Sequence, residues 1–196
     1  MRVRTEAKRQ QIIDQAAEVF REFGYDRASM AQIAASVGGS KTTLYGYFTS
    51  KQELFAAVMS DGMRAQGEAL IQLIDAAEME PRTALMTFGR RYIDLILSPD
   101  AIKLTRIGIA ESDEAIGAKI YEMGPGHGWL QVSRQLEGWI DRGLLRSAPT
   151  AIIAMHLKGL LEVALLEPSI YGVEPSISRD DAVTWGVDAF LRAYAV

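Results

Sequence analysis

A short stretch in the first third of the chain concentrates side chains that can bind phosphates and base edges. Residues 41–47, KTTLYGY, combine one lysine, two threonines and two tyrosines. If Leu44 marks the inward direction of a helix with about 100° per residue, Thr42 points outward. Thr43 and Tyr45 flank that outward face. A helix this short has little reason to expose such groups unless another surface meets it, and the major groove of DNA fits this description.

A helix, a tight turn and a second helix are predicted to position that face. Ser29 can cap the first helix, and Gln32 completes a capping box with it. Gly38 supplies the left-handed conformation that ends a helix at low cost, and Ser40 can cap the next helix. The two helices are therefore expected to be joined by only a few residues.

Flanking helices are predicted to hold this pair. The preceding helix ends at Gly24, and its apolar residues recur at helical spacing. They are Ile12, Ile13, Ala16, Ala17, Phe20 and Phe23. After the pair, Ser50 and Glu53 are expected to form a second capping box, which opens a long helix over 51–75. This pattern predicts a three-helix head that the long helix ties to the body.

The rest of the chain is also predicted to be helical, because apolar residues recur at spacings of three and four and Gly and Pro mark segment ends. The expected helices cover residues 51–75, 82–98, 101–111, 113–123, 127–142, 150–167 and 179–195. We therefore predict an all-α protein with a head domain in residues 1–50 and a larger helical body in residues 51–196.

Composition and motifs argue against several classes of protein. The 196 residues include no cysteine, which excludes disulfides and thiolate metal sites. No signal peptide or membrane span is evident, so we expect a cytoplasmic protein with no membrane partner. His127 and His156 lack a matching carboxylate motif, and the glycine-rich segments 38–42 and 124–128 do not match a phosphate loop. We expect neither an enzyme nor a metal or other cofactor.

Charge is distributed unevenly along the chain. The formal net charge is −4, but residues 1–60 carry eight Lys and Arg against six Asp and Glu. The remaining residues carry thirteen against nineteen. A mildly basic head on an acidic body would confine phosphate contacts to the head. Ordinary solvated charge is the alternative explanation.

Residues 9–58 resemble the N-terminal DNA-binding domain of the tetracycline repressor (TetR) family. The resemblance rests on the aliphatic first helix, its Gly-Tyr stop and a series of spaced residues. These are Ile33-Ala34, Gly38, Leu44-Tyr45, Tyr47-Phe48, and Lys51 before Leu54. The resemblance implies a helix-turn-helix domain that binds double-stranded DNA.

Carried over by position, the resemblance assigns contacts to eight residues. Those expected to face base edges are Lys41, Thr42 and Thr43. Those expected to hold phosphates are Tyr45, Tyr47 and Lys51, with the helix caps Ser29 and Ser40 as secondary phosphate contacts. Plain packing is the alternative for the two tyrosines.

Two residues depart from the family pattern. Gly39 stands where the family usually has a branched apolar residue, so the turn has more backbone freedom. Thr42 stands where Gly, Pro or Ala is common, so the outward face carries an extra hydroxyl and methyl group. Both departures bear on the docking angle and the operator sequence, not on DNA binding itself.

The middle of the body is similar to the C-terminal domain of AefR-like regulators in the same family. The matching positions are Leu104, Ile107, Ala110-Glu111, Tyr121 and Gly124-Pro125. The resemblance implies a ligand-binding domain, and pockets are mostly apolar with a few polar anchors. The residues suited to the wall of such a pocket are Phe88, Tyr92, Ile107, Glu111, Tyr121, Met123, Trp129 and Met155. For each of them, an ordinary core position is the alternative.

Two segments of the body are candidates for a dimer interface. Segment 150–167 is apolar over most of its circumference. Segment 179–195 carries an apolar stripe of Ala182, Val183, Gly186, Val187, Phe190 and Tyr194. The resemblance implies that these helices form half of a four-helix dimer interface, and core helices of a monomer are the alternative.

These observations together predict a homodimeric transcriptional regulator, a repressor rather than an activator. It is expected to bind a pseudo-palindromic operator and to respond to a small, largely apolar effector. The alternative is a helical small-molecule binding protein whose head no longer reads DNA.

Overall fold

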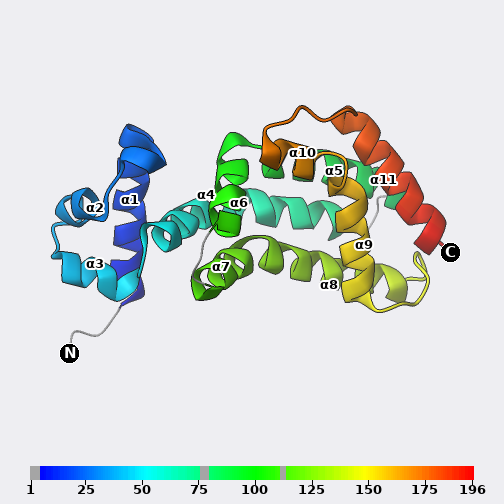
Figure 1. Ribbon diagram of the computed structural model, residues 1–196. Helices are drawn as coiled ribbons and strands as arrows, with labels where there is room; N and C mark the ends of the chain where they lie inside the picture. The colour runs from blue at the N-terminus through cyan, green and yellow to red at the C-terminus, as the bar shows by residue number, and fades with distance from the viewer. Residues whose placement is uncertain (1–4, 76–79, 111–113) are drawn as a thin grey trace. The chain divides into compact units, whose positions relative to one another are not determined.

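The computed structural model describes residues 5–75, 80–110 and 114–196, and every regular element in these ranges is a helix (Figure 1). The helices are α1 (Glu6–Arg27), α2 (Met30–Ser36), α3 (Lys41–Tyr47), α4 (Lys51–Asp75), α5 (Pro81–Ile96), α6 (Pro99–Ala110), α7 (Glu114–Tyr121), the π-helical turn η1 (Glu122–Gly126), α8 (His127–Asp141), α9 (Thr150–Glu162), α10 (Leu166–Tyr171) and α11 (Arg179–Tyr194). The all-α prediction is confirmed. Within the described ranges, no helix is both long and apolar enough to span a bilayer.

The chain divides into two compact units, which are described separately. The head unit comprises residues 1–63 and 107–123, and the body unit comprises residues 64–106 and 124–196. The head unit therefore includes α7 as well as the helices expected from the N-terminal sequence. The domain boundary at residue 50 stays a prediction.

Helices α1, α2 and α3 of the head unit enclose a small apolar core (Figure 1). Ile12 of α1, Ile33 of α2 and Leu44 of α3 are all buried in it. The regular part of α1 ends at Gly24, whose φ of 72° lies in the left-handed region that glycine adopts without strain. The predicted end of the first helix is thus confirmed.

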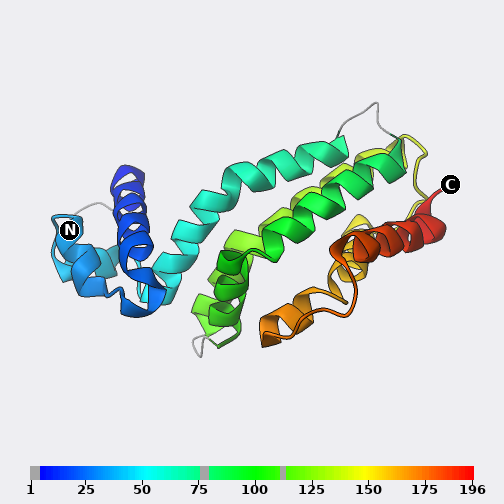
Figure 2. The same cartoon turned by 90° about the horizontal axis from the view of Figure 1, so that it is seen from above.

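The core of the body unit is built from α5, α8, α9, α11 and the C-terminal part of α4, which contributes Leu70 and Ile74. Figure 2 shows α11 (red) lying beside α9 (gold). Gly89 of α5 and Gly186 of α11 allow α11 to pack closely against α5 and α9, respectively. A Cβ atom on Gly89 would lie 2.7 Å from Val183 Cγ1, and one on Gly186 would lie 2.7 Å from the carbonyl oxygen of Leu160. Both distances are shorter than van der Waals contact, so this packing is possible only because glycine has no side chain at these two positions.

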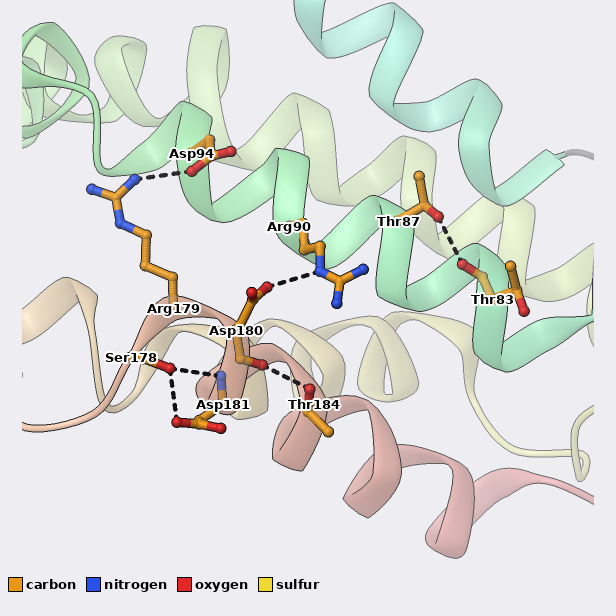
Figure 3. A network of polar contacts seen from close by, with 9 residues as sticks. All are labelled: Thr83, Thr87, Arg90, Asp94, Ser178, Arg179, Asp180, Asp181 and Thr184. Carbon is orange, nitrogen blue, oxygen red and sulfur yellow. Dashed lines mark hydrogen bonds and ion pairs between the residues drawn. The ribbon is translucent and has the colours of Figure 1, made fainter.

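Ion pairs join α5 to α11 along the outside of this core, and Figure 3 shows two of them. The pairs are Arg82 with Asp188 (2.9 Å), Arg90 with Asp180 (2.8 Å) and Arg179 with Asp94 (2.9 Å). Exposed ion pairs of this kind contribute little to stability because water screens them, so the apolar contacts hold the helices together. The pairs favour one register of α11 against α5.

The prediction of one helix over 150–167 is wrong at its C-terminal end. Helix α9 ends at Glu162, and α10 begins at Leu166 after a short turn. Pro168, the residue after the predicted helix, is the third residue of α10. Proline is tolerated there because the amides of a first helical turn have no partner within the helix.

The apolar stripe of α11 packs within the chain, and the dimer interface expected from segments 150–167 and 179–195 stays a prediction for their other faces. Ala182, Val183, Gly186, Val187 and Phe190 are buried against α5 and α9 of the same chain. The core alternative therefore holds for this stripe. The exposed large apolar side chain of α11 is Trp185, which is 64% exposed.

We expect Gly186→Ala to destabilise the protein. The added methyl group would meet a backbone carbonyl, which cannot rotate away, so the overpacking should cost about 1 to 3 kcal/mol. Gly138→Ala on α8 is the matched control. Apart from the backbone of α8 itself, no atom of the described residues lies within 4 Å of its Cβ position, so the change should raise stability by about 0.5 to 1 kcal/mol. Thermal unfolding followed by circular dichroism measures both, and equal effects would contradict the close approach of α9 and α11.

Candidate nucleic-acid interface

Helix α3 presents the polar face that its sequence predicts. Leu44 is 2% exposed and anchors the inward side. Lys41, Thr42 and Tyr45 are exposed, and Tyr45 reaches 48%. Two hydroxyls, an ammonium group and an aromatic ring are therefore available on one side of a seven-residue helix.

Local capping holds α2 and α3 as expected. The backbone amide of Ser29 donates to Gln32 Oε1 (2.9 Å), and the Gln32 amide donates to Ser29 Oγ (3.3 Å), which completes the predicted capping box. Gly38 ends α2 with a φ of 68°. Ser40 Oγ accepts the Thr43 amide at 3.1 Å and lies 3.0 Å from Thr43 Oγ1. The predicted caps are confirmed, and they also engage the hydroxyl of Thr43.

Only one of the two hydrogen bonds of the second predicted capping box is present. Ser50 Oγ accepts the Glu53 amide at 3.0 Å, which is the expected cap of α4. The Glu53 carboxylate does not bond back to Ser50. It accepts the backbone amide and the hydroxyl of Thr49 instead, both at 2.7 Å. The carboxylate therefore closes the turn one residue earlier than the capping-box pattern predicts.

Lys51 is engaged by the protein itself. Its Nζ donates to the carbonyl oxygens of Tyr25 (2.9 Å) and Ala28 (3.1 Å), and it lies 4.3 Å from the centroid of the Tyr25 ring. An ammonium group has three donors, and two of them are directed at these carbonyls. The Lys51 side chain clamps the end of α1 to the start of α4, so a phosphate would have to replace contacts that the ammonium already makes.

Tyr47 also joins two elements of the head unit. Its hydroxyl accepts the backbone amide of Thr5 at 3.1 Å, which ties the last residue of α3 to the N-cap of α1. The phenol oxygen still has donor and acceptor capacity for another group. The sequence showed neither this contact nor the clamp at Lys51, because their partners lie 42 and more than 20 positions away.

In the body unit, three of the predicted pocket residues form an aromatic cluster. The rings of Phe88 and Tyr92 stack with centroids 5.6 Å apart. The Trp129 ring meets both edge-on, 6.0 Å from Phe88 and 5.1 Å from Tyr92. All three side chains are buried. Edge-to-face and offset contacts of this kind stabilise a core and equally suit the wall of a pocket.

A buried acid, Glu162, completes this cluster and was not among the residues predicted from the sequence. Trp129 Nε1 donates to the Tyr92 hydroxyl at 2.9 Å, and that hydroxyl donates to the Glu162 carboxylate. Lys158, one helical turn before Glu162, donates to the other carboxylate oxygen. Burial raises the pKa of Tyr92 well above its usual value, and the charge of Glu162 adds to this. A Lys and a Glu four residues apart on an otherwise apolar helix was the available signal.

The polar groups of this cluster are all engaged in hydrogen bonds. Among the described residues, no buried side-chain nitrogen or oxygen lacks a hydrogen-bond partner. A ligand that enters at Tyr92 or Glu162 would therefore compete with an existing bond rather than satisfy a free group.

The other predicted pocket residues are not part of this cluster. Met155 is exposed on α9 of the body unit. Ile107 is half-buried and Tyr121 is exposed, and both belong to the head unit. Glu111 and the side chain of Met123 lie outside the described residues. Nor do the described His, Asp and Glu residues form any group that could hold a metal ion.

Two family models match the sequence. The model described as bacterial regulatory proteins, tetR family, matches residues 12–58. The model described as AefR-like transcriptional repressor, C-terminal domain, matches residues 83–196. The matches cover both the helix-turn-helix and most of the remaining chain.

Similar proteins include a repressor and an activator. The nicotine-responsive transcriptional repressor HdnoR of Paenarthrobacter nicotinovorans is 32% identical over 78 residues, 40% of this chain and 40% of that protein. The transcriptional activator FasR of Mycolicibacterium smegmatis is 43% identical over 58 residues, 30% of this chain and 26% of that protein. Both alignments thus span less than two thirds of the relative. A solved TetR-family regulator from Mesorhizobium loti has a TM-score of 0.78 at 26% identity, with 100% of both chains covered.

We expect Lys51→Met to lower the free energy of unfolding by about 1.5 to 3 kcal/mol, because two carbonyls lose a charged donor. Lys41→Met on the exposed start of α3 is the control and should change stability by no more than about 0.5 kcal/mol. Urea denaturation of both variants provides the comparison. If the two variants were equally stable, the clamp at Lys51 would contribute nothing to the fold.

Proposed function

The chain belongs to the tetR family of bacterial regulatory proteins and is a DNA-binding transcriptional regulator, and from this premise we propose that it is a ligand-responsive repressor that binds a pseudo-palindromic operator as a homodimer. The family is one of regulators and not of enzymes, and it implies a DNA operator and a small-molecule effector as partners. We place its proposed action in the cytoplasm, where operator DNA is accessible.

The exposed polar face of α3 is the observation that carries the proposal. Lys41 is the first residue of the helix, where a positive charge is unfavourable for the helix macrodipole. The negative charge of a DNA duplex nearby would offset this cost. Thr42 and Tyr45 add exposed hydroxyl groups, and hydroxyls are common donors to DNA bases and phosphates.

We assign base-edge contacts to Lys41, Thr42 and Thr43. We assign phosphate contacts to Tyr45, Tyr47 and Lys51, with Ser29 and Ser40 in support. Tyr47 and Lys51 already bond within the head unit, so their phosphate contacts require them to share or exchange those bonds. Tyr45 needs no such exchange for its ring to meet DNA, and its exposure makes it the best placed of the three.

Repression rather than activation is supported by the matched C-terminal family, which is described as that of a transcriptional repressor. The similar proteins include a transcriptional repressor and a transcriptional activator. The runner-up function, a helical small-molecule binding protein with an inactive head, has less support. An inactive head would have no need to keep both a capped α3 and its exposed polar face.

An apolar surface on α9 and α11 supports the homodimer. The large apolar residues of α9 that stay exposed recur at helical spacing, and Trp185 of α11 is exposed as well. Those of α9 are Ile152, Met155 and Leu160, and its C-cap Val163 is exposed as well. A second copy that covers this surface would remove it from water in both chains, and two heads would double the DNA contacts of one short helix.

For the effector, we propose a largely apolar small molecule that binds in the C-terminal domain. The aromatic cluster of Phe88, Tyr92 and Trp129 is the part of the predicted pocket that the body unit assembles. The proposed site does not draw on the other predicted pocket residues: Met155 lies on the surface assigned above to the dimer, and Ile107, Glu111, Tyr121 and Met123 stay predictions.

Thr42→Ala should change the base preference at one operator position by about 1 to 3 kcal/mol, because it removes a hydroxyl and a methyl group from the base-reading face. Tyr45→Phe should instead weaken binding to every duplex by a similar factor, because it removes only a phosphate donor. Affinities for a panel of duplexes with single base changes separate the two effects. Uniform weakening by Thr42→Ala would refute its base-reading role.

For the dimer, we expect sedimentation to return the mass of two chains, and Val163→Glu to shift it to that of one chain. A charge in the middle of an apolar interface cannot be paired or hydrated. Val173→Glu is the control, since Val173 is also largely exposed (60%, against 69% for Val163) but lies in the segment between α10 and α11. A wild-type protein with the mass of one chain at micromolar concentration would contradict the dimer.

A further inference from the structure

A buried carboxylate closes the turn that follows the recognition helix α3. This helix ends at Tyr47 and α4 begins at Lys51, so only three residues separate them. Glu53 is 8% exposed, and one of its oxygens accepts both the amide and the hydroxyl of Thr49, in the middle of this turn. The path of the chain as it leaves α3 is therefore set by the position of that carboxylate.

The second oxygen of the same carboxylate is held by Lys119. The distance from Lys119 Nζ to Glu53 Oε1 is 2.9 Å, and the lysine side chain is 49% exposed. Lys119 lies on α7, far outside the residues 12–58 that match the DNA-binding family model. Both residues nevertheless belong to the head unit, so the contact is internal to one compact unit.

The pKa of Glu53 reflects the opposing effects of burial and of its hydrogen bonds, one of which comes from Lys119. Burial alone raises the pKa of Glu53, but the hydrogen bonds from Thr49 and Lys119 outweigh it, and the pKa lies below its usual value of 4.5. The ionised carboxylate therefore stabilises the folded head at neutral pH, and this contribution is lost as the pH falls below 4.5 through the folded-state value. A buried charge that loses its counter-charge is strongly destabilised, and it relaxes by moving toward water.

We propose that Lys119 is a positioning residue for DNA binding, which acts through Glu53 and Thr49 on the exit of α3. This proposal rests on the proposed DNA-binding function and extends it beyond the helix-turn-helix. Without Lys119, the carboxylate moves toward solvent and the Thr49 bonds loosen. The angle at which α3 enters the groove is then no longer fixed.

A simpler role for Lys119 would be to add positive charge near the DNA. The two roles differ in their salt dependence and in their dependence on Glu53. Loss of a phosphate contact lowers the slope of log affinity against log salt by about one unit, whereas loss of positioning leaves the slope unchanged. If Lys119 acts only through its charge, its replacement also lowers the DNA affinity when Glu53 is neutral. If it acts by positioning Glu53, its replacement has no further effect in that background.

The test is a double-mutant cycle with Lys119→Met and Glu53→Gln in the full chain. The probe is a duplex that the wild-type protein selects from a random-sequence pool, and binding is measured at several salt concentrations. Lys119→Met should weaken binding roughly tenfold with an unchanged salt slope. It should cause little further loss in the Glu53→Gln background, and Lys119→Arg should restore the affinity. Hydrogen exchange at the Thr49 amide should be faster in Lys119→Met than in the wild type.

Each alternative outcome has a distinct meaning. Circular dichroism, recorded at a temperature where all variants are folded, separates positioning from unfolding. A salt slope lowered by one unit, together with an undiminished loss in the Glu53→Gln background, would overturn the proposal in favour of a phosphate contact. Unchanged affinity in Lys119→Met would overturn it as well. A wild-type protein that selects no duplex would instead overturn the DNA-binding function on which the proposal rests.

Discussion

A helix of seven residues is not stable in water by itself, and this constraint governs the head of the protein. Helix α3 makes few internal hydrogen bonds, so its surroundings must hold its shape. Ser40 caps its start, Leu44 anchors its inner side, and the Tyr47 hydroxyl ties its end to α1. Glu53 then fixes the turn that follows. The geometry offered to DNA is therefore set largely by residues that do not face DNA.

Local features of this arrangement were predictable from the sequence, and distant ones were not. The Ser29–Gln32 box, the left-handed Gly38 and the inward Leu44 each depend on a window of a few residues. The contact of Lys119 with Glu53 joins residues 66 positions apart. Lysine is mostly a solvated surface residue, so nothing in its sequence context specifies a buried partner. The family resemblance identified the fold of the head but not this contact.

In the body, apolar periodicity indicated which residues are buried but not what they pack against. The stripe of α11 follows helical spacing whether it meets α9 of its own chain or a second copy, and the structure shows the first. The same ambiguity affects the predicted pocket, because aromatic residues line cores and pockets alike. Phe88, Tyr92 and Trp129 do come together, but apolar periodicity could not indicate the buried Glu162 that satisfies Tyr92, whose signal was its spacing of four residues from Lys158.

Recognition of a pseudo-palindromic operator by the proposed dimer requires that its two α3 helices contact DNA at a fixed spacing and orientation. Sequencing the duplexes that the full chain retains from a random pool tests this most directly. We predict one enriched motif with two inverted half-sites whose centres lie about 10 base pairs, or a multiple of that, apart. Retained duplexes that share no motif, or that carry a single unpaired half-site, would contradict the account.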